Sequence, residues 1–252
     1  MLKPGSEYSY PGLSTAMVRG AMERPWLPAS MWKTFFQRAL SVGVRAAPTV
    51  FLMSLCVGFV IALVLQEQLA KLSMQDRVPR LIWVILNHQL APLLTATVFI
   101  GRSVAGTAAE LANMKIAEEI KALETMGVDL SRYLLLPVLA AFGVMLPVMT
   151  IYTMGVGLIG AFLICSQTLG MSADQFVVRA LEGAQISDVL VSIGKAWVFS
   201  LMAAMIAFNK GLNATGGSDA VGRVATAAVV TALVSVTAIN AVITGLQLLL
   251  KR

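Results

Sequence analysis

The chain has 252 residues, of which 58% are hydrophobic and only 13% are charged. Soluble domains typically carry about 25% charged residues, so this composition excludes an ordinary soluble domain and predicts an integral membrane protein. The formal net charge of +6 is spread among apolar segments and forms no basic domain, so we expect no nucleic-acid partner. Both cysteines, Cys56 and Cys165, lie in apolar runs without metal-ligand spacing and are interpreted as packing residues.

The N-terminal part of the chain divides into two segments. Residues 1–30 are polar and contain several prolines, without the apolar core of a signal peptide, so a cleaved signal is not expected. Residues 31–47 predict an amphipathic helix, with Trp32 and Phe35 on the apolar stripe and Arg38 on the polar face. This pattern is typical of a helix lying in the interface of an anionic leaflet, and it also fits a helix packed on protein.

Five apolar stretches are long enough to cross a bilayer, since a transmembrane helix needs about 20 residues. They lie at about 49–66, 81–103, 134–165, 189–209 and 222–250. The third is longer than one span requires and contains Pro137 and Pro147, so the sequence allows a kinked or tilted helix as well as a broken pair. The predicted fold is an all-α integral membrane protein with an N-terminal interfacial helix and five transmembrane helices.

Between the second and third spans, residues 101–133 form a polar-rich stretch that predicts an amphipathic helix. The stretch is rich in Ala, Glu, Leu and Lys, contains no proline, and has Gly127 in the position of a C-cap. If the N-terminus is cytoplasmic, 12 of the 19 Lys and Arg residues lie on the cytoplasmic side, as the positive-inside rule favours. The charged helix then lies in the cytoplasm, where a soluble partner can bind it.

Familiar ligand-binding motifs are absent or better explained by packing. Gly155, Gly157 and Gly160 match G-x-G-x-x-G, but they lie in an apolar span with no strand before them, so close helix packing is the interpretation. No G-x-x-x-x-G-K-[ST] loop occurs, and the chain has one histidine, so we expect no catalytic, nucleotide or metal site in it. The glycine-rich segment 209–223 could bind an anion, and a tight turn is the preferred interpretation.

Polar side chains inside the spans are the informative ones. Asn87, His88 and Gln89 lie near the middle of the second span, and Asn240 lies deep in the fifth. Such groups are costly against lipid, so we expect them to face the bundle interior, a subunit interface or a wet cavity. Hydrogen bonding between helices explains them equally well. Lys195, near one end of the fourth span, could extend its amine to the interface.

Two blocks of sequence carry a resemblance to a known family. Residues 88–137 read HQLAPLLTATVFIGRSVAGTAAELANMKIAEEIKALETMGVDLSRYLLLP. The second block is GKAWVF around Lys195, followed by KGLNATGGSDAVGRVATAAVV. In order and spacing these blocks resemble the MlaE/YrbE permeases of MCE-associated ABC transporters, which move phospholipids or related lipids. Relatives frequently have R-E-L-G-P where this chain has HQLAP, Asp in place of Asn240, and proline in place of Leu130.

The resemblance implies one permease domain over residues 31–252, present in two copies as a homodimer or with a paralogue. It implies a bacterial inner-membrane location, with a cytoplasmic N-terminus and a periplasmic C-terminus. It assigns the substrate lining to His88, Gln89, Lys195 and Asn240. The implied partners are an MCE-domain protein and a separate ABC ATPase, which carries ATP and Mg²⁺ and receives a coupling helix at about 105–126. The residues expected in that contact are Glu110, Met114, Glu118, Glu119, Ile120, Leu123 and Glu124.

Two other functions fit parts of the sequence. An ion-coupled secondary transporter would normally show buried ionisable residues and internal repeats, whereas none of the five predicted spans has a central Asp or Glu. A membrane scaffold that anchors a cytoplasmic partner would explain the charged helix but not the polar residues of the second and fifth spans. The direction of transport and the identity of the lipid stay open.

Overall fold

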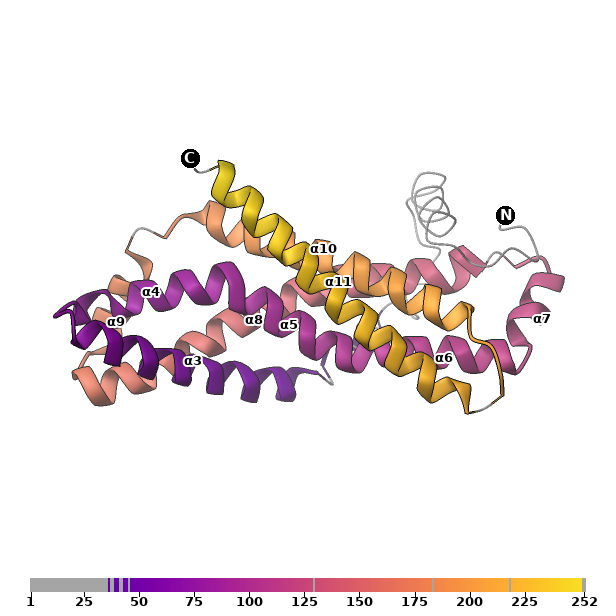
Figure 1. Ribbon diagram of the computed structural model, residues 1–252, viewed down its shortest axis with the longest axis horizontal. Coiled ribbons are helices and arrows are strands. Elements are labelled where there is room, and N and C mark those ends of the chain that lie inside the picture. The colour runs from indigo at the N-terminus through magenta and orange to yellow at the C-terminus, as the bar shows by residue number, and fades with distance from the viewer. Residues whose placement is uncertain are drawn as a thin grey trace. The chain divides into compact units, whose positions relative to one another are not determined.

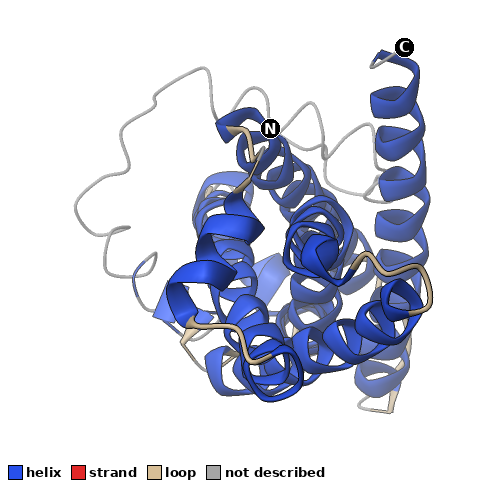
Figure 2. Ribbon diagram, turned by 90° about the vertical axis from the view of Figure 1, so that its left-hand side faces the viewer, coloured by secondary structure: helices blue, strands red, loops and turns tan. Residues whose placement is uncertain are grey.

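The computed structural model describes residues 36, 39, 40, 43, 44, 46–128, 130–182, 184–217 and 219–250. The interfacial helix predicted over residues 31–47 lies mostly outside these residues. Within the described ranges the chain consists of helices joined by short connections and has no strand (Figure 2). The predicted all-α fold class is confirmed.

The first helices belong to the first two spans and the segment that follows them. They are α3 (Ala47–Ala70), the 3-10 turn η1 (Gln75–Arg77), α4 (Val78–Ile85), the π-helical turn η2 (Leu86–Leu90), α5 (Ala91–Phe99), the π-helical turn η3 (Ile100–Val104), α6 (Ala105–Ile116) and α7 (Glu119–Thr125). The later helices are the π-helical turn η4 (Ser131–Leu135), α8 (Leu136–Leu169), α9 (Ala173–Leu181), α10 (Ile186–Leu212) and α11 (Ala220–Leu250). Because α8 runs through Pro147 without interruption, the third span is one helix and not a broken pair.

Among the described residues, five helical segments are long and apolar enough to cross a membrane, which confirms the predicted number. They are Ala47–Ala70, Gln75–Ile116, Tyr133–Leu169, Ile186–Leu212 and Ala220–Gln247. The second segment extends well beyond the predicted 81–103, because α6 follows η3 directly. The single helix predicted over about 105–126 is divided in the structure, since α6 ends at Ile116 and α7 begins at Glu119.

The chain forms two compact units. The first comprises Met1–Arg45, Phe99–Met145 and Val198–Arg252, and the second comprises Ala46–Val98 and Leu146–Trp197. In the first unit, α11 packs along α6 (Figure 1). The rings of Phe99 and Phe142 pack edge to face in the same unit, with their centroids 4.7 Å apart.

In the second unit, glycines bring α3 and α8 into direct backbone contact. A Cβ atom on Gly58 would lie 2.0 Å from the carbonyl oxygen of Gly157, and one on Gly160 would lie 2.4 Å from that of Leu55. Only glycine fits at such a close approach of two helices. Gly155 has open space around its Cβ position. The packing interpretation of the glycine motif is therefore confirmed for Gly157 and Gly160.

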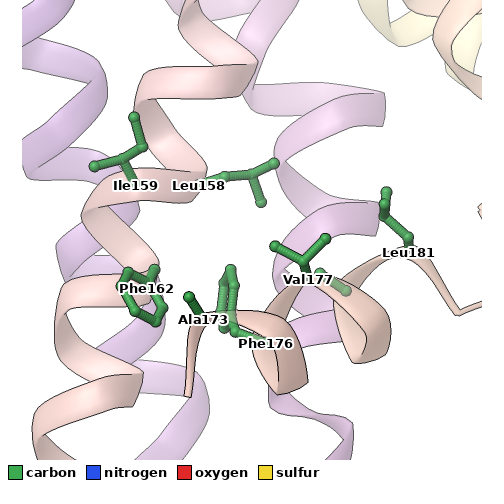
Figure 3. Close-up of a pocket in the computed structure, with 8 residues that line it drawn as sticks. Leu158, Ile159, Phe162, Ala173, Phe176, Val177 and Leu181 are labelled. Carbon is green, nitrogen blue, oxygen red and sulfur yellow. The ribbon is translucent and has the colours of Figure 1, made fainter. Parts of the chain in front are cut away.

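Helix α9 lies against α8 in the second unit, where Phe176 and Ala180 are buried. Ser172 and Gln175 begin α9 with a capping box, in which each side chain pairs with the other residue's backbone N–H. Between α8 and α9 is an apolar pocket of about 210 Å³ (Figure 3). It is lined by Leu158, Ile159, Phe162, Ala173, Phe176, Val177, Ala180 and Leu181.

Candidate functional site

The polar triplet of the second span lies on the π-helical turn η2. The N–H of Ala91 donates to the carbonyl of Leu86, five residues earlier, as a π-helix requires. Pro92 has no N–H and stands four residues after His88 and five after Asn87. Pro92 therefore cannot donate to the carbonyl of His88, as an α-helix would require, or to that of Asn87, as a π-helix would require. The α-helical donor to Asn87 would be the N–H of Ala91, which already donates to Leu86. The carbonyls of Asn87 and His88 therefore lack their usual α-helical donors, and donors from a neighbouring helix can serve them.

One face of α10 supplies these donors. Ser192 Oγ donates to the carbonyl of Asn87 over 2.8 Å, and Lys195 Nζ donates to the carbonyl of His88 over 3.0 Å. The Ser192 hydroxyl also lies 3.0 Å from the carbonyl of Asp188 in its own helix, so its proton is shared between two acceptors. The side chain of Asp188 places Oδ1 3.5 Å from Nε2 of His88. Spacings of four and three residues put positions 188, 192 and 195 on one face of the helix.

The cluster is closed on one side and open on the other. Lys195 is only 2% exposed and Ser192 is fully buried, whereas the side chains of His88 and Asp188 are each 20% exposed. Asn87 is also fully buried, and neither its Nδ2 nor its Oδ1 has a hydrogen-bond partner among the described residues. An unpaired buried amide costs about 1–3 kcal/mol. Two of the residues predicted for the substrate lining, His88 and Lys195, are thus in contact through the backbone of His88.

The other two residues expected in the substrate lining lie on separate helices. Gln89 is half-buried on η2, next to His88 in the second unit. Asn240 is half-buried on α11 in the first unit. Both residues are only partly covered by the rest of the described chain.

The segment expected to bind a cytoplasmic partner contains a sharp corner. Glu118, between α6 and α7, has a left-handed backbone with φ of 60°, a conformation that costs a non-glycine residue about 1–2 kcal/mol. Its carboxylate accepts a 2.8 Å hydrogen bond from Lys121. At the other end of α7, Gly127 has φ of 74°, and the N–H groups of Gly127 and Val128 donate to Glu124 and Leu123. This Schellman-type ending confirms the C-cap predicted at Gly127.

Carboxylates are exposed on α6, on α7 and between them. The exposed residues of the predicted contact set are Glu110, Glu118 and Glu119, and its half-buried residues are Met114, Leu123 and Glu124. Ile120 is 4% exposed and packs inward in the first unit. The hydrogen bond from Lys121, followed by its positive charge, lowers the pKa of Glu118, and the same contacts raise the pKa of Lys121.

Helix α6 is attached firmly to the end of the fourth span within the first unit. Lys115 Nζ donates to the carbonyl of Leu212, the last residue of α10. Gly211 packs so closely that a Cβ atom there would lie 2.6 Å from Cβ of Leu111. A lysine at a helix C-terminus satisfies one of the carbonyls that has no partner in the helix and interacts favourably with the dipole. Helix α6 and the end of α10 are therefore in direct contact at two points.

In the part of the chain that the structure describes, no group of three or more His, Cys, Asp or Glu residues could hold a metal ion. The arrangement is one of helix-borne polar groups, and comparison with known proteins identifies the family of the chain. Residues 35–246 match the family described as Permease MlaE. The chain belongs to the MlaE permease family.

Individual members of related families support this assignment. The chain is 36% identical over 151 residues to a probable ABC transporter permease protein of Synechocystis sp., covering 60% of this chain and 57% of that protein. It is 26% identical over 232 residues to protein TRIGALACTOSYLDIACYLGLYCEROL 1, chloroplastic, of Arabidopsis thaliana, covering 92% of this chain and 66% of that protein. It is 27% identical over 210 residues to a probable ABC transporter permease protein of Rickettsia typhi, covering 83% and 81%. The chain therefore spans less than two thirds of the length of the first two.

Two residues of this cluster are not among the site residues predicted from the sequence. Asp188 and Ser192 both contact η2. A signal for them was present, because Asp188, Ser192 and Lys195 have helical spacing and Pro92 removes donors from the second span. Pairing the two observations requires knowing that these helices are neighbours.

Proposed function

We propose that the chain is the membrane-spanning permease subunit of an ABC transporter that moves phospholipids or related lipids. The match to the MlaE permease family over residues 35–246 carries this proposal. The five apolar helices supply the membrane domain that such a subunit needs. A lipid cargo is supported by the Arabidopsis relative, whose name refers to a diacylglycerol lipid.

In this proposal the lipid meets His88 and Gln89 of the second unit, with Lys195 behind His88, and Asn240 of the first unit also contacts lipid. A lipid has a polar headgroup that needs partners and acyl chains that do not. Half-buried polar side chains within otherwise apolar spans meet the first need, and they are costly if they face only hydrocarbon. A second copy of the permease, or a paralogue, would close the path, and an MCE-domain protein on the periplasmic face would pass the lipid on or receive it.

Energy would enter through α6 and α7. The chain has no phosphate-binding loop, so ATP and Mg²⁺ would be bound by a separate ABC ATPase, and the chain itself would have no ATPase activity. The exposed carboxylates around the corner at Glu118 would form the polar rim of that contact. The attachment of Lys115 to Leu212 gives the contact a route to the fourth span. We place the N-terminus and this contact in the cytoplasm of a bacterium and the C-terminus in the periplasm, which reporter fusions at residues 121 and 252 would test.

Charge reversal tests the ATPase contact. In Glu118→Lys with Glu119→Lys, we expect the chain to reach the membrane but to lose the ATPase on purification in mild detergent. A charge mismatch in a docked interface costs several kcal/mol, and about 1.4 kcal/mol already lowers affinity tenfold. Glu67→Lys is the matched control, because Glu67 and Glu118 are both 71% exposed and each pairs with a lysine on the next turn. Equal ATPase recovery from the two variants would contradict the proposed contact.

Photo-crosslinking tests the lipid path. Crosslinkers replacing Gln89 and Asn240 should capture lipid in the assembled complex, and the captured lipid is identified by mass spectrometry. Val230 is 55% exposed on α11 and serves as the control that reports lipid at the outer surface. Capture at Val230 alone would mean that Gln89 and Asn240 only form hydrogen bonds between helices.

A further inference from the structure

We propose that Asp188, Ser192 and Lys195 form a positioning face on α10 that holds η2 in its π-helical form and so fixes how His88 and Gln89 meet the lipid. The inference rests on the lipid path proposed above. In it, Lys195 acts through the backbone of His88 and does not itself contact the lipid.

The first step is the demand for donors within η2. Pro92 and the π-helical bond from Ala91 to Leu86 leave the carbonyls of Asn87 and His88 without their usual partners. In the hydrocarbon region of a membrane an unsatisfied backbone group costs several kcal/mol, and side chains of neighbouring helices are a known way of satisfying it. Without Ser192 and Lys195, η2 would have to change its hydrogen bonding, and its side chains would turn with it.

The second step is the position of the donors. Ser192 is fully buried and Lys195 is 2% exposed, so both lie on the closed side of the cluster. The ammonium group of Lys195 donates to the backbone carbonyl of His88. The open side presents the imidazole of His88 instead, with 20% of its side chain exposed.

The third step is that His88 is held at two points by one helix face. Lys195 binds its carbonyl, and Asp188 lies 3.5 Å from the Nε2 atom of its ring. A group held at both backbone and side chain has one orientation. Such preorganisation raises the affinity for a ligand, because less conformational freedom is lost on binding. Gln89 follows His88 on the same turn, so its direction is set by the same contacts.

The chain offers an unusually direct test, because His88 is its one histidine. Isotope-labelled histidine in the full chain, purified with a tag that contains no histidine and placed in lipid nanodiscs, gives imidazole resonances from His88 alone. We expect one sharp set in the wild type. Lys195→Met and Ser192→Ala should shift or split it, because each removes a donor to η2. The control variants Lys71→Met and Ser54→Ala should leave it unchanged, since Ser54 is also buried but bonds only Val50 of its own helix.

Lipid labelling in the same nanodiscs supplies the second measurement, with a phosphatidylethanolamine that carries a photoreactive acyl chain as the probe. We expect His88→Ala, Lys195→Met and Ser192→Ala each to lower labelling of the η2 segment about threefold to tenfold. The Ser192 variant is decisive, because a fully buried neutral hydroxyl cannot contact the probe itself.

The outcomes distinguish a failure of the positioning face from a failure of the proposed lipid path. If His88→Ala and Gln89→Ala leave labelling unchanged, the lipid path is misplaced, and the positioning face falls with it. If they lower labelling while Ser192→Ala and Lys195→Met leave both the resonances and the labelling unchanged, only the positioning face is overturned. If Lys195→Met lowers labelling with the His88 resonances unchanged, Lys195 contacts the lipid directly and the inference is likewise overturned.

Discussion

The contact between Gly58 and Gly157 makes a sharp prediction about how the second unit tolerates a single methyl group. In Gly58→Ala, the new Cβ would lie 2.0 Å from a backbone oxygen, whereas ordinary contact begins at 3.4 Å, so α3 and α8 must separate by about 1.4 Å. Overpacking costs about 1–3 kcal/mol, and the upper end applies because a backbone atom of a long helix cannot turn aside. The gain in helix propensity from glycine to alanine returns at most about 1 kcal/mol.

The net loss in the free energy of unfolding should therefore be about 2 kcal/mol. For a chain of this size it corresponds to a decrease in Tm of roughly 4–8 °C. The assay is thermal unfolding of the full chain in a single detergent, and unfolding is monitored as the loss of the monodisperse peak.

Glycines on α8 give graded controls for this assay. Gly155→Ala meets nothing within 4 Å and should be neutral or slightly stabilising. Gly157→Ala would meet the side chain of Leu86 at 2.9 Å, which can move, so its effect should be intermediate. Equal Tm values for Gly58→Ala and Gly155→Ala would refute the argument from close backbone contact.

Two further predictions concern α6 and α7. Lys115→Met removes the donor to Leu212 and should lower the free energy of unfolding by about 1–2 kcal/mol relative to the control Lys210→Met; equal thermal stability of the two variants would contradict this. The pair of Glu118 and Lys121 should also make the corner before α7 sensitive to acid. Because Lys121 lowers the pKa of Glu118, the contribution of Glu118 is present above the ordinary glutamate pKa and is lost as the pH falls through the lowered value. Hydrogen exchange of α7, corrected for intrinsic rates, should show this loss at low pH in the wild type and no such step in Lys121→Gln.

The membrane architecture could be predicted from the sequence because it depends on local quantities. Length and apolarity were sufficient for the five spans. The apolar setting of the glycine motif also identified Gly157 and Gly160 as packing residues, whereas Gly155 has open space around it. Gly127 was recognisable as a C-cap because glycine adopts the left-handed conformation without cost.

The corner at Glu118 could not be predicted in this way. Alanine and glutamate are good helix formers, so propensity favours a continuous helix through Ala117 and Glu118. The break depends on where tertiary packing places α7, whose residue Ile120 is buried. The contacts of η2 with α10 could not be predicted from the sequence for a similar reason, since they join residues more than 100 positions apart.

That separation has a consequence for how the protein is made. Asn87 and His88 meet their donors Ser192 and Lys195 only after another 105 and 107 residues have been added to the chain. At a synthesis rate of about 5–20 residues per second, the second span must wait roughly 5–20 s for the fourth. During that interval its two carbonyls must be satisfied by water, by headgroups or by the insertion machinery, because hydrocarbon offers no donor. The second span can therefore acquire its final form only when the fourth has entered the membrane beside it.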